Sequence, residues 1–183
     1  MNSFYNKEEL LSLGLKTFGD NVLISKKASI YSPEEIVVGN NVRIDDFCIL
    51  SGKITLGNNI HISAYCALYG RGGISIDDYS GISARTTIYS LSDDFSGDCL
   101  IGVMVPEKFR KVIYAEVKIE KYCQVGSHSI VLPRVNLSEG CVVGAASLVN
   151  KSLEEWTIYA GVPAKRIKQR NRDAILNLIK NLK

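Results

Sequence analysis

An aliphatic side chain recurs at every sixth position in the C-terminal half of the chain. Neither the 3.6-residue period of a helix nor the two-residue alternation of a strand gives this spacing. A fixed short period is typical of a solenoid, in which six residues form one flat strand and its turn. We expect three such units to close one triangular coil, with the aliphatic residues inside and small residues near the corners. The aliphatic members are Ile119, Val125, Val131, Leu137, Val143 and Val149, and the small or slim ones, four positions further on, are Cys123, Ser129, Val135, Cys141 and Ser147.

The same six-residue period occurs earlier in the chain. Its members are Val38, Ile44, Leu50, Leu56, Ile62 and Leu68, with Val42, Cys48, Ile60 and Cys66 at the companion positions. A two-residue slip at 71–73 is followed by Ile76, Ile82 and Ile88, and the period then stops until Ile119. The segment 92–116 is therefore predicted to be a loop that leaves the coil between two turns. Long loops in compact domains are usually functional or disordered, so we expect the chemistry here.

The pattern predicts an all-β solenoid over residues 21–170 with a helical segment on each side. In residues 1–20, Asn6 can cap a short helix and Gly14 can end it, and this segment is expected to cover the open first turn of the coil. Residues 171–183 are predicted to form an amphipathic helix from about Arg172, which packs on its own coil or on a neighbouring subunit. Its apolar face comprises Ile175, Leu178, Ile179 and Leu182.

Composition narrows the classes of function. The chain has 183 residues, 46% apolar and 22% charged, which suits one buried core. The net charge of +3 comes from dispersed Lys and Arg residues, so nucleic acid is not an expected partner. No apolar run approaches the roughly 20 residues of a membrane span, and no signal peptide is recognisable, which makes the cytoplasm the expected location.

The cysteine pattern favours packing over metal binding. Cys48, Cys66, Cys123 and Cys141 fall on the small companion positions of the repeat, and the chain contains no CxxC pair. Cys99 lies in the predicted loop and is interpreted as a bystander. We therefore predict no metal site.

Two motifs near the end of the repeat make the interpretation more specific. They are the runs VGAASLV at 143–149 and AGVPAK at 160–165. With a loop in the expected place, the chain resembles the hexapeptide-repeat acyltransferases, whose fold is a left-handed parallel β-helix. It looks most similar to the branch of galactoside, maltose and nodulation-factor acetyltransferases and to related sugar acyltransferases of surface polysaccharide synthesis. The resemblance covers roughly residues 37–170 and implies a homotrimer with active sites between subunits.

The resemblance also implies acyl-CoA, by default acetyl-CoA, as the acyl donor. The pantetheine would meet backbone amides near Gly126, Ser127, Ala145 and Ala146. The adenine and phosphates would lie near Pro163, Lys165 and Arg166, and Lys151 adds positive charge for the phosphates. A solvated basic tail is the alternative interpretation of these charges.

One residue departs from the family pattern at the root of the loop. The galactoside and maltose branch has a catalytic histidine there, in a run such as Tyr-Thr-Ala-Thr-His, whereas this chain has Asp93. A sugar hydroxyl needs a base poised near neutrality, and a carboxylate with a pKa of ~4 serves poorly. An amine is a good nucleophile once deprotonated and needs orientation and proton removal. Asp93 therefore favours an amino sugar as acceptor, although the sequence leaves open whether Asp93 or Asp94 is the functional carboxylate.

Other residues are candidates for the same site. Ser83 follows the inward Ile82 and can direct its hydroxyl toward the amine, or it is only a turn serine. His128 lies beside the predicted thioester amides and is the alternative base, or it is a corner residue facing solvent. His61, just before a residue of the repeat, is interpreted as structural and at a turn. The candidates for acceptor binding are Asp94, Tyr65, Tyr89 and Arg85.

The predicted loop also carries a basic cluster. Its members Lys108, Arg110 and Lys111 can meet the diphosphate of a nucleotide sugar, or they form a solvated charged run.

The leading hypothesis is an acyl-CoA-dependent N-acyltransferase acting on a nucleotide-linked amino sugar. Three alternatives remain at this point. The first is O-acetylation of a sugar hydroxyl with His128 as base. The second is a metal-dependent hydratase similar to the γ-type carbonic anhydrases, which use three histidine ligands. This chain has two histidines in all, too few unless neighbouring subunits supply ligands. The third is a non-catalytic assembly protein, against which Asp93, Asp94 and the closing motifs argue.

Overall fold

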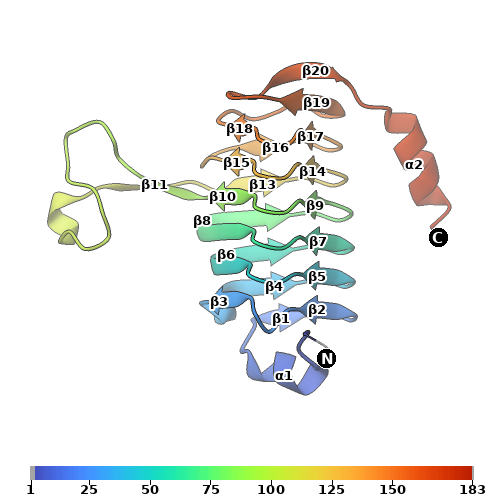
Figure 1. Ribbon diagram of the computed structural model, residues 1–183, viewed down its shortest axis with the longest axis horizontal. Helices are drawn as coiled ribbons and strands as arrows, with labels where there is room; N and C mark the ends of the chain where they lie inside the picture. Colours follow the sequence, from blue (N-terminus) through green and yellow to red (C-terminus); the bar gives the residue numbers. More distant parts are fainter. Residues whose placement is uncertain (1–2, 183) are drawn as a thin grey trace.

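The protein is a parallel β-helix with three flat faces, seen in a computed structural model that describes residues 3–182 (Figure 1). Each strand pairs with the equivalent strand of the turns before and after it, so the backbone hydrogen bonds run along the axis of the coil. The pairing is parallel and in register, as in Val42 opposite Val22 and Ile60 opposite Val42. The predicted solenoid of six-residue units is therefore confirmed.

The first face of the coil is a single sheet. In order along the axis its strands are β2 (Val22–Ile24), β5 (Val42–Ile44), β7 (Ile60–Ile62), β9 (Gly81–Ile82), β14 (Gln124–Val125), β17 (Val142–Val143) and β19 (Thr157–Ala160). Strand β20 (Lys165–Gln169) ends this sheet and pairs antiparallel with β19.

The second and third faces share one sheet, because β6 (Ile49–Leu56) and β8 (Ala67–Ile76) bend around the corner between them. The other strands of the second face are β3 (Ser29–Tyr31), β10 (Thr87–Tyr89), β15 (Ile130–Val131) and β18 (Leu148–Val149). Those of the third face are β1 (Thr17–Phe18), β4 (Ile36–Val38), β13 (Val117–Ile119) and β16 (Asn136–Leu137), with the 3₁₀ turn η1 (Pro33–Glu35) before β4.

The aliphatic residues of the repeat fill the inside of the coil. From Val38 to Val149, every aliphatic member of the predicted period is at most 2% exposed. Full burial of one such side chain stabilises the fold by about 1.5–3 kcal/mol. The interior row is therefore the main source of stability.

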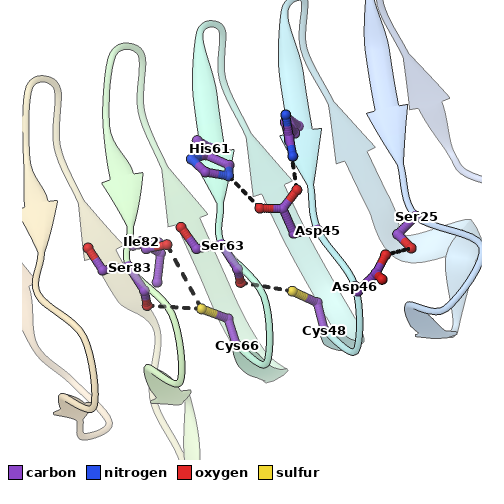
Figure 2. A network of polar contacts seen from close by, with 10 residues as sticks. Ser25, Asp45, Asp46, Cys48, His61, Ser63, Cys66, Ile82 and Ser83 are labelled. Carbon is purple, nitrogen blue, oxygen red and sulfur yellow. Dashed lines mark hydrogen bonds and ion pairs between the residues drawn. The ribbon is translucent and has the colours of Figure 1, made fainter. Parts of the chain in front are cut away.

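The cysteines of the repeat pack in the same interior. Cys48 and Cys66 donate to backbone carbonyls of the following turn, at Ser63 and Ser83 (Figure 2). Burial raises the pKa of the Cys123 thiol to about 12, and it does the same for Cys141. The raised pKa values keep these two thiols protonated, and all four cysteines of the repeat are at most 2% exposed, as expected for packing groups.

The corners of the coil need left-handed backbone, which asparagine tolerates well. Asn41 and Asn59 have φ values of 55° and 58° at the corner before the first face. Beside them, Asn40 donates to the side chain of Asn58, and Asn58 donates to Asp78 on the next turn. The asparagines at this corner therefore link successive turns.

Short helices flank the coil at both ends. Helix α1 (Lys7–Ser12) begins at Asn6, whose side chain forms a capping box with Glu9, and Leu10 packs into the core. Helix α2 (Arg172–Lys180) begins at the predicted residue and contributes no buried residue within the chain (Figure 1). Among the described residues, no helix is both long and apolar enough to cross a membrane.

Segment 92–116 leaves the coil as predicted, but its root is a two-stranded ribbon that begins at Leu91. Strand β11 (Leu91–Asp93) pairs antiparallel with β12 (Val112–Tyr114), and η2 (Glu107–Phe109) lies further out (Figure 1). We refer to residues 91–114 as the hairpin. Each of its strands has three residues, which is too short for the sequence to have indicated them.

Hydrogen bonds to Ser90 fix the root of the hairpin on the coil. The Ala115 amide donates to the Ser90 carbonyl, and the Gly72 amide donates to Ser90 Oγ. A Cβ atom on Gly72 would lie 2.0 Å from the Ser90 oxygen, so only glycine fits at this contact.

Asp94 stabilises the hairpin through contacts with two other hairpin residues. Lys111 Nζ donates to one carboxylate oxygen at 2.9 Å, and the Ser96 amide donates to the other at 2.9 Å. The hydrogen bond from Lys111, with that from Ser96, lowers the pKa of Asp94 to about 2. Because the native pKa lies below the unfolded value of ~3.9, the contribution of Asp94 to hairpin stability is present above that value and is lost as the pH falls toward 2.

We predict that the Asp94 carboxyl group titrates near pH 2 and that Lys111→Met moves its pKa upward toward the ordinary range. The measurement is an NMR pH titration of the side-chain carboxyl carbons. Lys108→Met is the matched control, because Lys108 lies over the Phe109 ring and makes no contact with Asp94. An Asp94 pKa that is unchanged in Lys111→Met would contradict the role of this ion pair.

Candidate active site

A cavity of about 590 Å³ lies where the hairpin leaves the coil. This size is typical of a small-molecule site. One wall is the outer surface of the second face, with Tyr69 and Tyr89 stacked at 5.2 Å between ring centroids. The opposite walls come from the hairpin and from Leu132 and Pro133 on a later turn. The cavity is therefore bounded by the segment that the interrupted repeat had marked.

Strand alternation turns Asp93 toward this cavity. Successive side chains of a strand point to opposite faces, so Leu91, Asp93 and Phe95 share one side of the ribbon. All three line the cavity together with the intervening Ser92, and Asp93 is half-buried there. The Asp93 carboxylate and the stacked tyrosines thus line one cavity.

Asp94 follows Asp93 in the chain and is not among the described residues that line the cavity. Both of its oxygens are engaged by Lys111 and Ser96. The geometry therefore separates the two aspartates, which the sequence alone had not done.

Ser83 lies on a different part of the coil from Asp93. Strand β10 runs along the second face between them, and Ser83 is at the corner where the first face ends. Its Oγ accepts a hydrogen bond of 2.9 Å from Gln124 Nε2, which leaves the hydroxyl hydrogen to donate to a ligand. Its backbone N–H donates to Val125, which precedes Gly126.

Three further predicted residues share the corner of Ser83. Tyr65, Arg85 and His128 all have left-handed φ values, and all three are exposed. The Arg85 guanidinium lies 4.8 Å from the centre of the Tyr65 ring. His128 is exposed, and its backbone N–H donates to Ala84. These three residues therefore lie near Ser83 and outside the cavity of Asp93. Among the predicted acceptor-binding residues in the described part of the chain, Tyr89 is the one that lines this cavity.

The predicted CoA-binding residues follow the coil from this corner toward its C-terminal end. A Cβ atom on Gly126 would lie 2.5 Å from the amide nitrogen of Ala145, so the two turns touch through bare backbone. Ser127 and Ala146 occupy the same corner, where the Ala146 amide donates to the Ser127 carbonyl. An exposed backbone surface of this kind suits a narrow pantetheine arm.

A second cavity, of about 270 Å³, lies further along the coil and brings Lys151, Pro163 and Lys165 together. Arg166 is exposed on β20 and donates to Gln169. This arrangement provides positive charge where the nucleotide end of CoA was expected. The residues present therefore fit the predicted donor.

His61 is not at a turn as expected but within β7, on its outward side. Its Nε2 lies 2.7 Å from Asp45 on the preceding turn (Figure 2). His61 and His128 are on different turns, and among residues 3–182 no three His, Cys, Asp or Glu side chains gather closely enough to hold a metal ion. The donor set for a metal-dependent hydratase is thus missing from the described part of the chain.

Several residues that line the Asp93 cavity escaped the sequence analysis. Arg71 and Tyr114 line it from the coil and the hairpin, and Leu132 and Pro133 close it from a later turn. One signal was available, because the two-residue slip at 71–73 marks the turn that supports the hairpin. Leu132 and Pro133 are about 40 positions from Asp93 in the chain, and only the stacking of turns brings them near.

Comparison with known proteins identifies relatives over the whole chain. No family model matches the chain. The dTDP-4-amino-4,6-dideoxy-D-glucose acyltransferase of Escherichia coli is 40% identical over 173 residues, which is 93% of this chain and 90% of that protein.

Solved structures of AntD, an N-acyltransferase from Bacillus cereus, share both fold and sequence with this chain. The complex of AntD with dTDP and 3-hydroxybutyryl-CoA is 51% identical, covers 100% of this chain and 97% of that one, and has a TM-score of 0.95. A complex of an aspartate-substituted AntD with dTDP and coenzyme A gives a TM-score of 0.96 at 50% identity, with 100% and 98% coverage. The expected left-handed β-helix is thereby confirmed, and this chain belongs to the hexapeptide-repeat sugar acyltransferases.

Proposed function

We propose that this protein transfers an acyl group from acyl-CoA to the amino group of a nucleotide-linked amino sugar, in the cytoplasm and for a surface polysaccharide. The observation that carries the proposal is the Asp93 carboxylate, which lines the cavity at the hairpin root where the galactoside and maltose branch has a catalytic histidine. A carboxylate at this place suits an amine that must be held and relieved of a proton. It does not suit a hydroxyl that must be activated.

The relatives support the same acceptor class. The Escherichia coli relative is named for a 4-amino sugar linked to dTDP, and one AntD structure contains that amino sugar together with coenzyme A. The AntD variants include substitutions of a serine and of an aspartate ten positions later. Ser83 and Asp93 have the same spacing here, which supports assigning them as the corresponding pair.

In this mechanism Asp93 binds and orients the acceptor. Its carboxylate accepts hydrogen bonds from the ammonium form and then from the neutral amine, and it helps to pass to solvent the first proton, which the ammonium must lose before attack. Acyl-CoA supplies a thioester carbonyl carbon, at which the C–N bond forms while the C–S bond breaks, and the leaving thiolate takes the second proton from the nitrogen to become the free thiol. Ser83 donates its remaining hydroxyl hydrogen within the same site.

The acyl donor lies along the corner that leads from Ser83 toward the C-terminal end. Gly126, Ser127, Ala145 and Ala146 offer a bare backbone surface for the pantetheine arm. Lys151, Lys165 and Arg166 attract the phosphates, and Pro163 supports the adenine end. With its phosphates held near the C-terminal end of the coil, the donor directs its acyl group toward the corner of Ser83.

The positions of Ser83 and Asp93 support a homotrimer with a shared site. Strand β10 separates them within one chain, so one chain does not bring both to the same small acceptor. A neighbouring copy that places its Ser83 corner against the Asp93 cavity completes the site and brings the donor to the acceptor. Each active site in this arrangement uses residues of two subunits.

The acceptor class is tested by thiol release from acetyl-CoA with a matched panel of sugars. We expect release with dTDP-linked 3- or 4-amino-deoxy sugars and none above background with their hydroxyl counterparts or with simple galactosides. The physical reason is that a carboxylate is a poor base for a sugar hydroxyl, and no histidine is among the described residues that line the cavity. Release with the hydroxyl sugars would replace this proposal by O-acylation with His128 as the base.

Replacing Asp93 by asparagine keeps the size of the side chain and removes its charge. We predict that Asp93→Asn lowers kcat/KM for the amino sugar about 100-fold or more, since the amide neither attracts the ammonium nor accepts its proton. Steady-state kinetics provide the measurement, with Asp98→Asn as the control because Asp98 lies further out on the hairpin. Full activity in Asp93→Asn would exclude the proposed role.

Mixed trimers test whether each site uses two subunits. Co-expression of Asp93→Asn chains with Ser83→Ala chains gives some interfaces with both natural residues, roughly a quarter of the total if subunits mix at random. We predict that such mixtures regain activity above the mean of the two pure variants. If Ser83 and Asp93 of one chain formed the site, the purified mixture would show no gain.

A further inference from the structure

The side of the hairpin that faces the Asp93 cavity also carries an arginine. Residues 110, 112 and 114 alternate along the second strand of the ribbon and its extension, just as 91, 93 and 95 do along the first, and all six line the cavity. Arg110 therefore shares with Asp93 a wall of the same space. Of the basic cluster of the hairpin, Arg110 lines this cavity, whereas Lys108 and Lys111 do not.

The guanidinium of Arg110 is largely buried, yet among the described residues it has neither a close ion pair nor a full set of hydrogen-bond acceptors. The side chain is 16% exposed, and its ion-pair partner Glu107 is 3.6 Å away and 90% exposed. Its Nε is buried and has no hydrogen-bond partner within residues 3–182. A solvent-exposed pair at this distance contributes little, whereas a buried donor without a partner is costly. Arg110 thus has donor capacity that an anion in the cavity can satisfy.

A second cation faces the same space from the coil. Arg71 follows the stacked Tyr69 on β8, and its guanidinium lies 5.8 Å from the centre of the Tyr114 ring. Among the described lining residues, Asp93 is the single carboxylate opposite two guanidinium groups. The cavity therefore has net positive charge and attracts a ligand that combines a cationic amine with a larger negative charge elsewhere.

The arrangement of the charges suits one kind of ligand. Asp93 pairs with Val112, so Arg110 is its diagonal neighbour on the ribbon, and both residues line the cavity. In a nucleotide-linked amino sugar, the pyranose ring lies between the amino group and the phosphate on the anomeric carbon. One end of the sugar can then meet Asp93 while the phosphates meet the arginine.

We propose that Arg110, together with Arg71, binds the diphosphate of the sugar nucleotide and so fixes the amine of the sugar against Asp93. This inference rests on the proposed function and deepens it, because it assigns the acceptor specificity of the site to the hairpin. Arginine is suited to the task, since its planar group donates two parallel hydrogen bonds to a phosphate. The diphosphate of CoA is expected elsewhere, at the cavity that Lys151 and Lys165 line.

The test is calorimetric titration of dTDP, thymidine and coenzyme A into the wild-type protein, Arg110→Gln and the control Lys108→Gln. We expect Arg110→Gln to weaken dTDP binding about 10- to 100-fold, as loss of a charged hydrogen bond does. Binding of thymidine and coenzyme A is expected to be unchanged, and Arg110→Lys is expected to recover part of the dTDP affinity. Lys108→Gln is expected to behave as wild type, because Lys108 lies over Phe109 and outside this cavity.

Kinetics give an independent readout. Arg110→Gln is expected to raise the KM for the nucleotide-linked amino sugar and to leave the KM for acetyl-CoA unchanged. Circular dichroism melting confirms that the variant is folded; if it is not, Arg71→Gln replaces it in the same titrations, with the same selective loss of dTDP binding expected. Unchanged dTDP affinity, or an equal loss for dTDP, thymidine and coenzyme A, would overturn the proposal.

The same titrations separate this inference from the proposed function. If the wild-type protein binds dTDP through Arg110 but transfers acetyl to no amino sugar, the proposed function fails and the diphosphate site stands. If it transfers acetyl to amino sugars but binds dTDP no better than thymidine, the diphosphate site fails and the proposed function stands.

Discussion

The fold depends on one constraint. Every turn of the coil must place aliphatic side chains at equivalent interior positions and leave its backbone flat enough to pair with the next turn. The members of the period from Val38 to Val149 satisfy it with at most 2% exposure. Because each turn contacts only its neighbours, a segment can leave the coil between two turns without disturbing the others. The hairpin uses this freedom between β10 and β13.

The hairpin in turn converts an inert sheet surface into a site. The second face by itself offers the stacked Tyr69 and Tyr89, which form a flat floor. The ribbon of β11 and β12 adds a carboxylate and an arginine above that floor, and Ser90 and Gly72 hold its root in place. Charged groups are thereby brought to the surface of a coil whose buried core is formed mainly by aliphatic side chains and cysteines.

The two adjacent aspartates have different environments because successive side chains of a strand point to opposite sides. Asp93 faces the cavity, whereas Asp94 binds Lys111 and Ser96 and holds the hairpin together. Exchange of their roles would require a shift of one residue in the pairing of β11 with β12, which would turn every side chain of the ribbon to its other side. The pairing register therefore selects the acid that faces the cavity.

The sequence by itself determined the coil, its interior residues, the place of the hairpin, the start of α2 and the acyltransferase family, because a short period and local caps are written in neighbouring positions. It also pointed to Asp93 as a candidate site residue, through the family position that this residue takes. Only the tertiary structure distinguished Asp93 from Asp94, separated Ser83 from the Asp93 cavity and brought Arg71, Arg110 and Leu132 to that cavity. These relations arise from strand register and from the stacking of turns, which join residues distant in the chain and leave no mark in local sequence.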